Sequence, residues 1–218
     1  CAIVKASVCG IFAEPTFKSE MVSQALQLEK VEIIKKKDRW YHIRLEYDGY
    51  KGWIHEMYLN DSPNLSDSFN EDMFLDFPII KTAFQMLGAP YLWGGRSCQG
   101  YDCSGLIQTT MNLLGFDFPR DTKDQVNSQL LYQVEIENVL EEDIIFFEEN
   151  KIVNHIGVCI SKNLNANEES DYRLHIIHSS GTVRVSEVVV NKSLYAYIDQ
   201  GSNKKVKLHK IMRFKENV

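Results

Sequence analysis

The sequence predicts an α+β protein in which a small β-module precedes a domain of helices followed by strands. Three observations lead to this fold class. Residues 1–60 alternate apolar and polar side chains with the period of two expected of strands, and residues 60–73 are polar, acidic and rich in Pro, Ser and Asn. Beyond them, apolar residues take helical spacing before the strand pattern returns. We therefore expect a β-module at 1–60, a linker at 61–75 and a second domain at 76–218.

Within the β-module, alternation is clearest in the stretch "WYHIRLEYDGYKGWI" at residues 40–54. The dipeptide Asp48-Gly49 interrupts it. A tight hairpin turn needs a positive φ, which Gly adopts at low cost. The stretch therefore predicts two strands joined by a hairpin.

The second domain begins with two predicted helices. Pro78 suits the first turn of a helix, and apolar residues at helical spacing follow it until Gly88. A second helix is predicted over residues 104–114, ending at Gly115. Strand-like segments then follow at 143–147, 155–160, 174–180, 182–190 and 207–214. Because no helix separates these strands, they predict an antiparallel sheet with the helices packed on it.

The composition limits the possible function classes. Hydrophobic residues make up 44% of the 218 residues and charged residues 25%, which indicates a folded chain with a real core. A formal net charge of −6 argues against a nucleic-acid partner, because binding to phosphate backbones depends on Lys and Arg. No apolar run approaches the roughly 18 residues of a membrane-spanning helix.

The number and spacing of the cysteines indicate the cellular compartment of the protein. They stand at 1, 9, 98, 103 and 159, an odd and irregular set that does not indicate a disulfide framework. A reducing compartment is therefore favoured, and we expect a cytoplasmic location. The cell envelope is the alternative if an N-terminal signal was removed before Cys1.

One cysteine stands where a nucleophile would be expected. In "GYDCSGLIQ", Cys103 lies at the start of the second predicted helix. Unpaired N–H groups and the positive end of the helix dipole lower a thiol's pKa at such a position, so we expect an activated thiol. Taken alone, Cys103 is also consistent with a small buried hydrophobic residue.

Two histidines downstream favour the catalytic interpretation of Cys103 over the structural one. A thiolate nucleophile needs an imidazole that takes and returns its proton, and this imidazole needs an orienting partner. His155 opens one strand-like segment and His178 lies near the end of another. Either histidine alone would suit ordinary packing, but together with Cys103 they favour a catalytic site.

Several sequence blocks resemble one family. "PYLWGGRSCQGYDCSGLIQ", "LLGFDFPRDTKDQ", "EEDIIFF", "NHIGVCI" and "IIHSSGTVRVS" occur in the order seen in the NlpC/P60 cysteine peptidases, over about residues 76–190. Residues 1–60 are similar to the bacterial SH3 domains fused to this family. The resemblance implies an SH3-like β-barrel followed by a papain-like NlpC/P60 domain. The combination is similar to γ-D-glutamyl-L-diamino-acid endopeptidases.

The resemblance also implies roles for particular residues. Cys103 matches the nucleophile, His155 the general base and His178 the residue that orients the imidazole, while Tyr91 matches a tyrosine placed near the oxyanion. No metal or organic cofactor is implied.

The implied substrate is a short peptidoglycan peptide with a free N-terminal L-alanine, cleaved in murein peptide turnover or recycling. Asp102 and Ser104 match positions that bind substrate. Glu20 and Tyr50 of the β-module are candidates for helping Asp102 hold the substrate amine.

Two departures from the family pattern stand out. Glu142 precedes Asp143 where the family usually has Gly, and we expect it to alter a turn without affecting the chemistry. The polar segment 161–173 resembles an inserted hairpin tip and leaves His175 open as the orienting residue. Because side chains alternate along a strand, only one of His175 and His178 can face the site. The adjoining "SSG" favours His178.

Other functions stay open at this point. One is a zinc site built from Cys98 and Cys103 with either His155 and Cys159 or His175 and His178, although the spacing is weak. Another is a non-catalytic protein that binds the cell wall through its SH3-like module. A third is a hydrolase that acts on intact peptidoglycan stems, since the same groups serve acyl chemistry in general.

Overall fold

The computed structural model describes residues 2–46, 48–59, 76–163, 171–198 and 205–215. The predicted linker at 61–75 and the tip of the predicted insertion at 164–170 lie outside these residues. Contacts divide the chain into two units, residues 1–64 with 88–90 and residues 65–87 with 91–218. The exact domain bounds stay a prediction. No helix among the described residues is long and apolar enough to cross a membrane.

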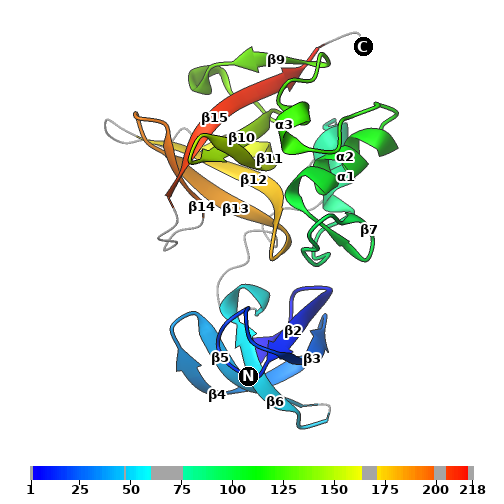
Figure 1. The fold of residues 1–218 in the computed structure, drawn as a ribbon, viewed down its shortest axis with the longest axis vertical. Helices are drawn as coiled ribbons and strands as arrows, with labels where there is room; N and C mark the ends of the chain where they lie inside the picture. The colour runs from blue at the N-terminus through cyan, green and yellow to red at the C-terminus, as the bar shows by residue number, and fades with distance from the viewer. Residues whose placement is uncertain (1, 47, 60–75, 164–170, 199–204, 216–218) are drawn as a thin grey trace. The chain divides into compact units, whose positions relative to one another are not determined.

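The first unit is built from strands, as predicted (Figure 1). A six-stranded antiparallel sheet in the described residues has the order β1-β4-β5-β6-β2-β3. Its elements are β1 (Ala2–Ile3), β2 (Val8–Phe12), β3 (Met21–Leu26), β4 (Lys30–Lys37), β5 (Trp40–Leu45), β6 (Lys51–His55) and a 3₁₀ turn η1 (Glu56–Tyr58).

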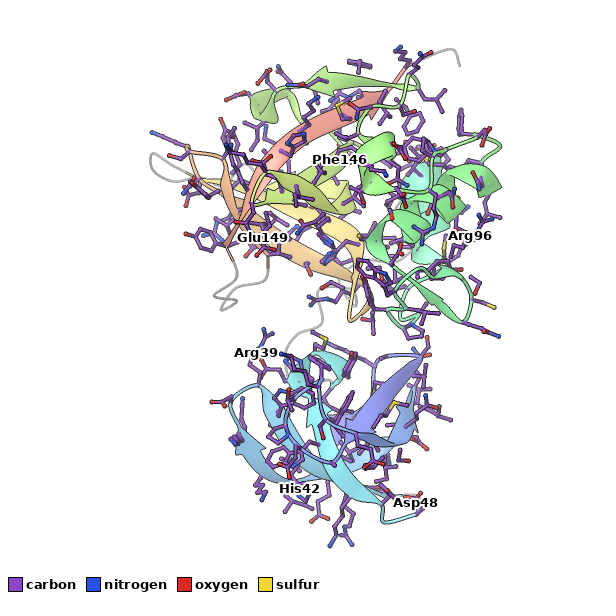
Figure 2. All side chains as sticks on the ribbon, viewed as in Figure 1. Arg39, His42, Asp48, Arg96, Phe146 and Glu149 are labelled. Carbon is purple, nitrogen blue, oxygen red and sulfur yellow. The ribbon has the colours of Figure 1, made fainter. Side chains whose placement is uncertain are left out.

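The predicted hairpin of this unit joins β5 to β6. Gly49 has a φ of +75°, and Asp48 lies at the hairpin tip in Figure 2. The alternation also holds, since Ile43 and Leu45 are buried while Arg44 between them is exposed. Ile43 and Leu45 of β5 and Ile54 of β6 join one apolar core, which stabilises the sheet from within.

The second unit contains the predicted helices and strands, along with shorter elements that the sequence pattern did not indicate. The helices are α1 (Pro78–Phe84), α2 (Cys103–Leu113), α3 (Thr122–Gln125) and a 3₁₀ turn η4 (Ile136–Asn138). The strands are β7 (Arg96–Ser97), β8 (Gly100–Tyr101), β9 (Leu131–Val134), β10 (Ile144–Glu149), β11 (Ile152–Asn163), β12 (Tyr172–Ser180), β13 (Thr182–Val190), β14 (Tyr195–Ile198) and β15 (Lys205–Phe214).

The predicted antiparallel sheet closes on itself. Among the described residues its seven strands have the order β10-β11-β12-β13-β14-β15-β9, and β10 also pairs with β15. The inner face carries an apolar core that includes Phe147, Cys159 and Ile176. Closure leaves β10 and β15 paired on both sides, which removes two exposed sheet edges.

Helices α1 and α2 pack against each other and against β11 and β12 (Figure 1). Figure 2 shows Arg96 on this helical side, whereas the fully buried Phe146 belongs to the barrel. The first helix ends at Phe84, three residues before the predicted Leu87. Its last turn tightens there, because the N–H groups of residues 85–87 bond to the carbonyls three positions earlier.

Glu142 caps the first helix from the strand side. It adopts a φ of +68°, and its Oε1 accepts hydrogen bonds from the N–H groups of Ile79 at 2.6 Å and Ile80 at 3.3 Å. Phe77, at the N-cap position, supplies no side-chain cap. The glutamate therefore satisfies N–H groups that the helix itself leaves open.

Candidate active site

The site is organised around the N-terminus of α2. Asp102 is the N-cap residue, and its Oδ1 accepts a hydrogen bond from the Gly105 N–H at 2.7 Å. Its Oδ2 accepts from the Gly94 N–H at 2.9 Å, which fixes the preceding loop. The acid next to Cys103 thus both begins the helix and holds the loop that approaches it.

Glycine is required where this loop meets the helix. The Gly95 carbonyl accepts the Asp102 N–H at 3.1 Å, so the loop backbone lies directly against the first helical turn. A Cβ placed on Gly105 would overlap the Gly95 carbonyl. The "CSG" sequence therefore reflects a close approach of two backbones at the position of the thiol.

Cys103 is buried at the start of α2, and its Sγ donates to the Asn154 carbonyl of β11 at 3.8 Å. Its pKa corrects our expectation of an activated thiol. Burial raises the pKa of Cys103 and the charge of Asp102 adds to this, whereas the N–H groups of the helix start and the Thr122 hydroxyl lower it by less. The donors we anticipated are present, but desolvation outweighs them. The resting thiol is therefore protonated at neutral pH.

Two histidines meet on the strands that α2 packs against. His155, which follows the Asn154 contacted by Cys103, has its Nε2 2.7 Å from Nδ1 of His178. His178 is fully buried. Burial, together with nearby His155 and Arg184, holds the pKa of His178 well below its usual range, so this imidazole is neutral.

Glycine also explains how the two strands bring these rings together. Gly157 lies opposite His178 on the neighbouring strand, because Val158 pairs with Ile177. A Cβ on Gly157 would lie 3.2 Å from the His178 Cβ and 3.0 Å from Ile176. The missing side chain therefore leaves room for the His178 ring beside His155.

His175 lies apart from this pair. Its Nδ1 is 2.9 Å from the Ser161 hydroxyl, and its register partner on β13 is Glu187. The alternation of β12 thus separates the two candidate residues, and the structure places His178 against His155. The role of His178 as orienting residue stays a prediction.

Tyr91 lies near both Cys103 and Asp102. Burial raises the pKa of Tyr91 to about 12, and the neighbouring Cys103 and Asp102 add to the effect. Its N–H donates to the Gly181 carbonyl at 2.9 Å, which holds the residue against the β12–β13 turn. A tyrosine in this state keeps its hydroxyl proton and can donate it to a developing oxyanion.

Arg120 is a site residue that sequence reasoning missed. Its two terminal nitrogens lie 3.0 and 2.6 Å from the two carboxylate oxygens of Asp102, and one of them also donates to the Ser104 hydroxyl at 2.8 Å. Burial alone would raise the pKa of Asp102, but hydrogen bonds from Arg120 and Gly105 hold it below its usual range. Arg120 lies in the family-like block "LLGFDFPRDTKDQ", but the sequence alone assigned it no role.

The carboxylate of Asp102 is consequently crowded. Gly94, Gly105, Ser104 and Arg120 together supply five hydrogen bonds to two oxygens, which offer about four lone-pair sites. A direct contact from Asp102 to a substrate amine therefore requires Arg120 to release part of the carboxylate. Ser104 is buried in the same network.

The two residues proposed from the β-module, Glu20 and Tyr50, directly precede β3 and β6. The Tyr50 hydroxyl donates to the Val22 carbonyl at 3.1 Å, two residues beyond the exposed Glu20. Their contact with a substrate amine stays a prediction.

The described part of the chain contains no group of three or more His, Cys, Asp or Glu side chains placed to hold a metal ion. The cysteines of the zinc alternative also differ in environment, since Cys98 is exposed and Cys159 is buried in the barrel core.

A buried thiol at a helix start, in contact with the residue before one of two hydrogen-bonded imidazoles, is an arrangement that suits a cysteine hydrolase. Residues 88–200, just over half of the chain, match the NlpC/P60 family, and the chain belongs to that family. Residues 11–59 match the bacterial dipeptidyl-peptidase SH3 domain. The predicted family and the two-part fold are confirmed.

Curated relatives match part of the chain. A γ-D-glutamyl-L-lysine dipeptidyl-peptidase of Bacillus subtilis is 38% identical over 85 residues, covering 38% of this chain and 28% of the relative. A protein of the same name from Bacillus cereus is 30% identical over 114 residues, covering 51% of this chain and 30% of the relative. The chain thus spans less than a third of the length of these relatives.

A solved structure of an NlpC/P60 family protein from Bacillus cereus is 21% identical to this chain. The alignment covers 98% of this chain and 62% of that one, with a TM-score of 0.45.

Proposed function

We propose that this chain is a cysteine endopeptidase that hydrolyses the γ-D-glutamyl-diamino-acid bond of short peptidoglycan peptides with a free N-terminal L-alanine. The observation that carries the proposal is the 2.7 Å contact between His155 and His178 beside the helix that presents Cys103. The names of the relatives and the SH3 match support the substrate class. The peptidoglycan fragments themselves are the proposed partners.

The first step is proton transfer within the site. Because burial keeps the Cys103 thiol protonated, a base must take its proton before attack. Nε2 of His155 is engaged with His178, so Nδ1 is the nitrogen that exchanges the proton. The resulting thiolate attacks the γ-carbonyl carbon of D-glutamate, and the carbonyl electron pair moves to oxygen.

The oxyanion then needs hydrogen-bond donors. The Cys103 N–H and the Tyr91 hydroxyl serve this role, since Tyr91 stays protonated at neutral pH. When the tetrahedral intermediate collapses, the C–N bond breaks and His155 returns its proton to the departing amine. Water, deprotonated by His155, hydrolyses the thioester and regenerates the thiol.

Recognition of the free amine is the specificity step. Burying an ammonium group without partners costs several kcal/mol, so oxygen acceptors must surround it. Asp102 contributes its charge while sharing its oxygens with Arg120, and Ser104 belongs to the same network. Glu20 and Tyr50 would complete the set from the SH3 module.

The experiment compares cleavage of L-Ala-γ-D-Glu-diamino-acid peptides with free and N-acetylated amines, followed by mass spectrometry. We expect the free peptide to be favoured at least about a hundredfold in kcat/KM, because a buried charge-assisted contact is worth roughly 2–5 kcal/mol. Glu20→Gln should shrink this ratio. Glu32→Gln, which removes the same charge from β4 of the same unit, should leave it unchanged.

The other outcomes select the alternatives. Equal kcat/KM for free and acetylated peptides would indicate a hydrolase of intact peptidoglycan stems. Binding of peptidoglycan without cleavage of either peptide would indicate a non-catalytic wall-binding protein.

A further inference from the structure

Ser186 completes a chain of hydrogen bonds that begins at His155. This serine lies on β13, is fully buried, and has its Oγ 2.8 Å from Nε2 of His178. We propose that Ser186 is a positioning residue that accepts the Nε2 proton of His178 and thereby selects the tautomer in which His178 supports His155. The inference rests on the proposed function for its catalytic meaning, and on geometry for the tautomer itself.

The number of protons on the two imidazoles fixes the direction of the hydrogen bonds between them. A neutral imidazole has one N–H donor and one acceptor nitrogen. When His155 has taken the Cys103 proton, both of its nitrogens are donors, so Nδ1 of His178 has to accept. The single proton of His178 must then lie on Nε2, where the acceptor within hydrogen-bond distance is the Ser186 hydroxyl.

The opposite tautomer would oppose catalysis. If His178 carried its proton on Nδ1, that N–H would point at Nε2 of His155, and the His155 proton would lie on Nδ1. His155 could not then accept a proton from the thiol. A serine hydroxyl can donate or accept, and the productive direction is the one in which Ser186 accepts from Nε2 of His178.

Sheet register explains why Ser186 stands there. Ser186 pairs with Ile176, and the direct partner of His178 is Arg184, so the serine reaches His178 diagonally across the β12–β13 ladder. Ile176 and Val188 on the same barrel face are apolar core residues. An Nε2 proton without Ser186 would thus lie in apolar surroundings, and buried N–H donors without acceptors are strongly disfavoured.

The first test measures turnover of the free peptide by Ser186→Ala. We expect kcat to fall at least about tenfold with KM within about twofold, because the change acts on the proton path and not on substrate contacts. Ser186→Thr keeps the acceptor oxygen and should recover most of this loss.

Ser161→Ala is the matched control. It removes a hydroxyl that lies 2.9 Å from Nδ1 of His175, the other buried histidine of β12. This variant loses the same kind of Ser–His hydrogen bond in the same sheet, but outside the His155–His178 pair. Its kcat should stay within about twofold of wild type.

The second test needs no activity. Nitrogen-15 chemical shifts of histidine-labelled protein report which ring nitrogen carries the proton, and His→Gln variants assign each ring. Wild type should show His178 protonated on Nε2, and Ser186→Ala should move the proton toward Nδ1. Ser161→Ala should change the signals of His175 and leave those of His178 unchanged.

The outcomes separate this inference from the proposed function. Should wild type cleave no peptide, the proposed function fails while the nitrogen shifts still decide the role of Ser186. A wild-type His178 protonated on Nδ1, an unchanged tautomer in Ser186→Ala, or an undiminished kcat in that variant would each overturn the inference. If Ser186→Ala does not fold, the wild-type tautomer and the Ser186→Thr kinetics decide it.

Discussion

Cys103 and Cys159 are two buried thiols of the same unit that share some of their contacts. Each S–H group donates to a backbone carbonyl of β11, Cys103 to Asn154 at 3.8 Å and Cys159 to Ser161 at 3.6 Å. Each accepting residue also has a histidine beside it: His155 follows Asn154 in the chain, and His175 is hydrogen-bonded to Ser161. Burial is the main cause of a raised pKa in both.

The two thiols differ in the groups that lower their pKa against the effect of burial. Around Cys103, the N–H groups at the start of α2 and the Thr122 hydroxyl lower the pKa, and His155 is backed by a second imidazole. Cys159 sits within the apolar barrel core, where the charges of Asp143 and Glu141 raise its pKa further. Burial therefore dominates the pKa of both thiols, and what distinguishes Cys103 is the set of donors that lower its pKa and the imidazole pair that includes the residue after Asn154.

The largest expected effect tests the comparison directly. Cys103→Ala and Cys103→Ser should each lower kcat for the free peptide at least about a thousandfold, because no covalent intermediate can form through the thiol. Cys159→Ala should leave kcat within about twofold but lower the melting temperature, since it removes a core sulfur. Residual turnover by Cys103→Ala above about a thousandth of wild type would remove the nucleophile assignment.

Replacing His178 should lower kcat far more than replacing His175. His178→Ala should lower kcat about a hundredfold with little change in KM, because an orienting residue acts through His155. His175→Ala should be nearly neutral, since its hydrogen bond runs to Ser161. Steady-state kinetics on the free peptide give both values, and the reverse ranking would assign the orienting role to His175.

The pH dependence of labelling tests the raised thiol pKa. A folded-state pKa above that of a free thiol leaves Cys103 protonated at neutral pH. As long as the pH is below that pKa, each increase of one pH unit raises the thiolate fraction about tenfold. Iodoacetamide labelling of Cys103, read by peptide mass spectrometry, should therefore rise steadily from pH 6 to pH 8. A plateau within this range would show an activated thiol and restore the original sequence-based expectation.

Asp102→Asn should separate the effect of the Asp102 charge on the pKa of Cys103 from the role of the side chain as the cap of α2. Loss of its charge should lower the pKa of Cys103 and speed labelling at pH 7 roughly fivefold, while the Asn oxygen can still cap α2. The exposed Cys98 serves as an internal reference that should keep its rate. Slower labelling of Cys103 in this variant would mean that the Asp102–Arg120 pair matters to the thiol mainly through local structure.

The smallest expected effect concerns the Thr122 hydroxyl. Thr122→Val removes a group that lowers the pKa of Cys103, so labelling at pH 7 should slow about two- to threefold. As a control, Thr110→Val removes a buried hydroxyl of α2 that bonds to the Leu106 carbonyl, and it should leave the rate unchanged.

The sequence by itself determined much of this protein. Local patterns predicted the strands of the first unit, the start of α2 at Cys103 and the antiparallel sheet formed by the later strands. Alternation along β12 separated His175 from His178, and the order of the sequence blocks identified the family. These features depend on relations between residues a few positions apart, which spacing in a sequence records directly.

Only the tertiary structure decided the rest. Closure of the barrel depends on pairing β10 with β15, and the contacts of Arg120 with Asp102 and of Ser186 with His178 depend on side chains brought together by packing or register. The raised pKa of Cys103 depends on how much surrounding protein excludes water from the thiol. Sequence spacing shows that a thiol begins a helix, but desolvation is a sum over all its neighbours in space, and that sum exists only once the chain has folded.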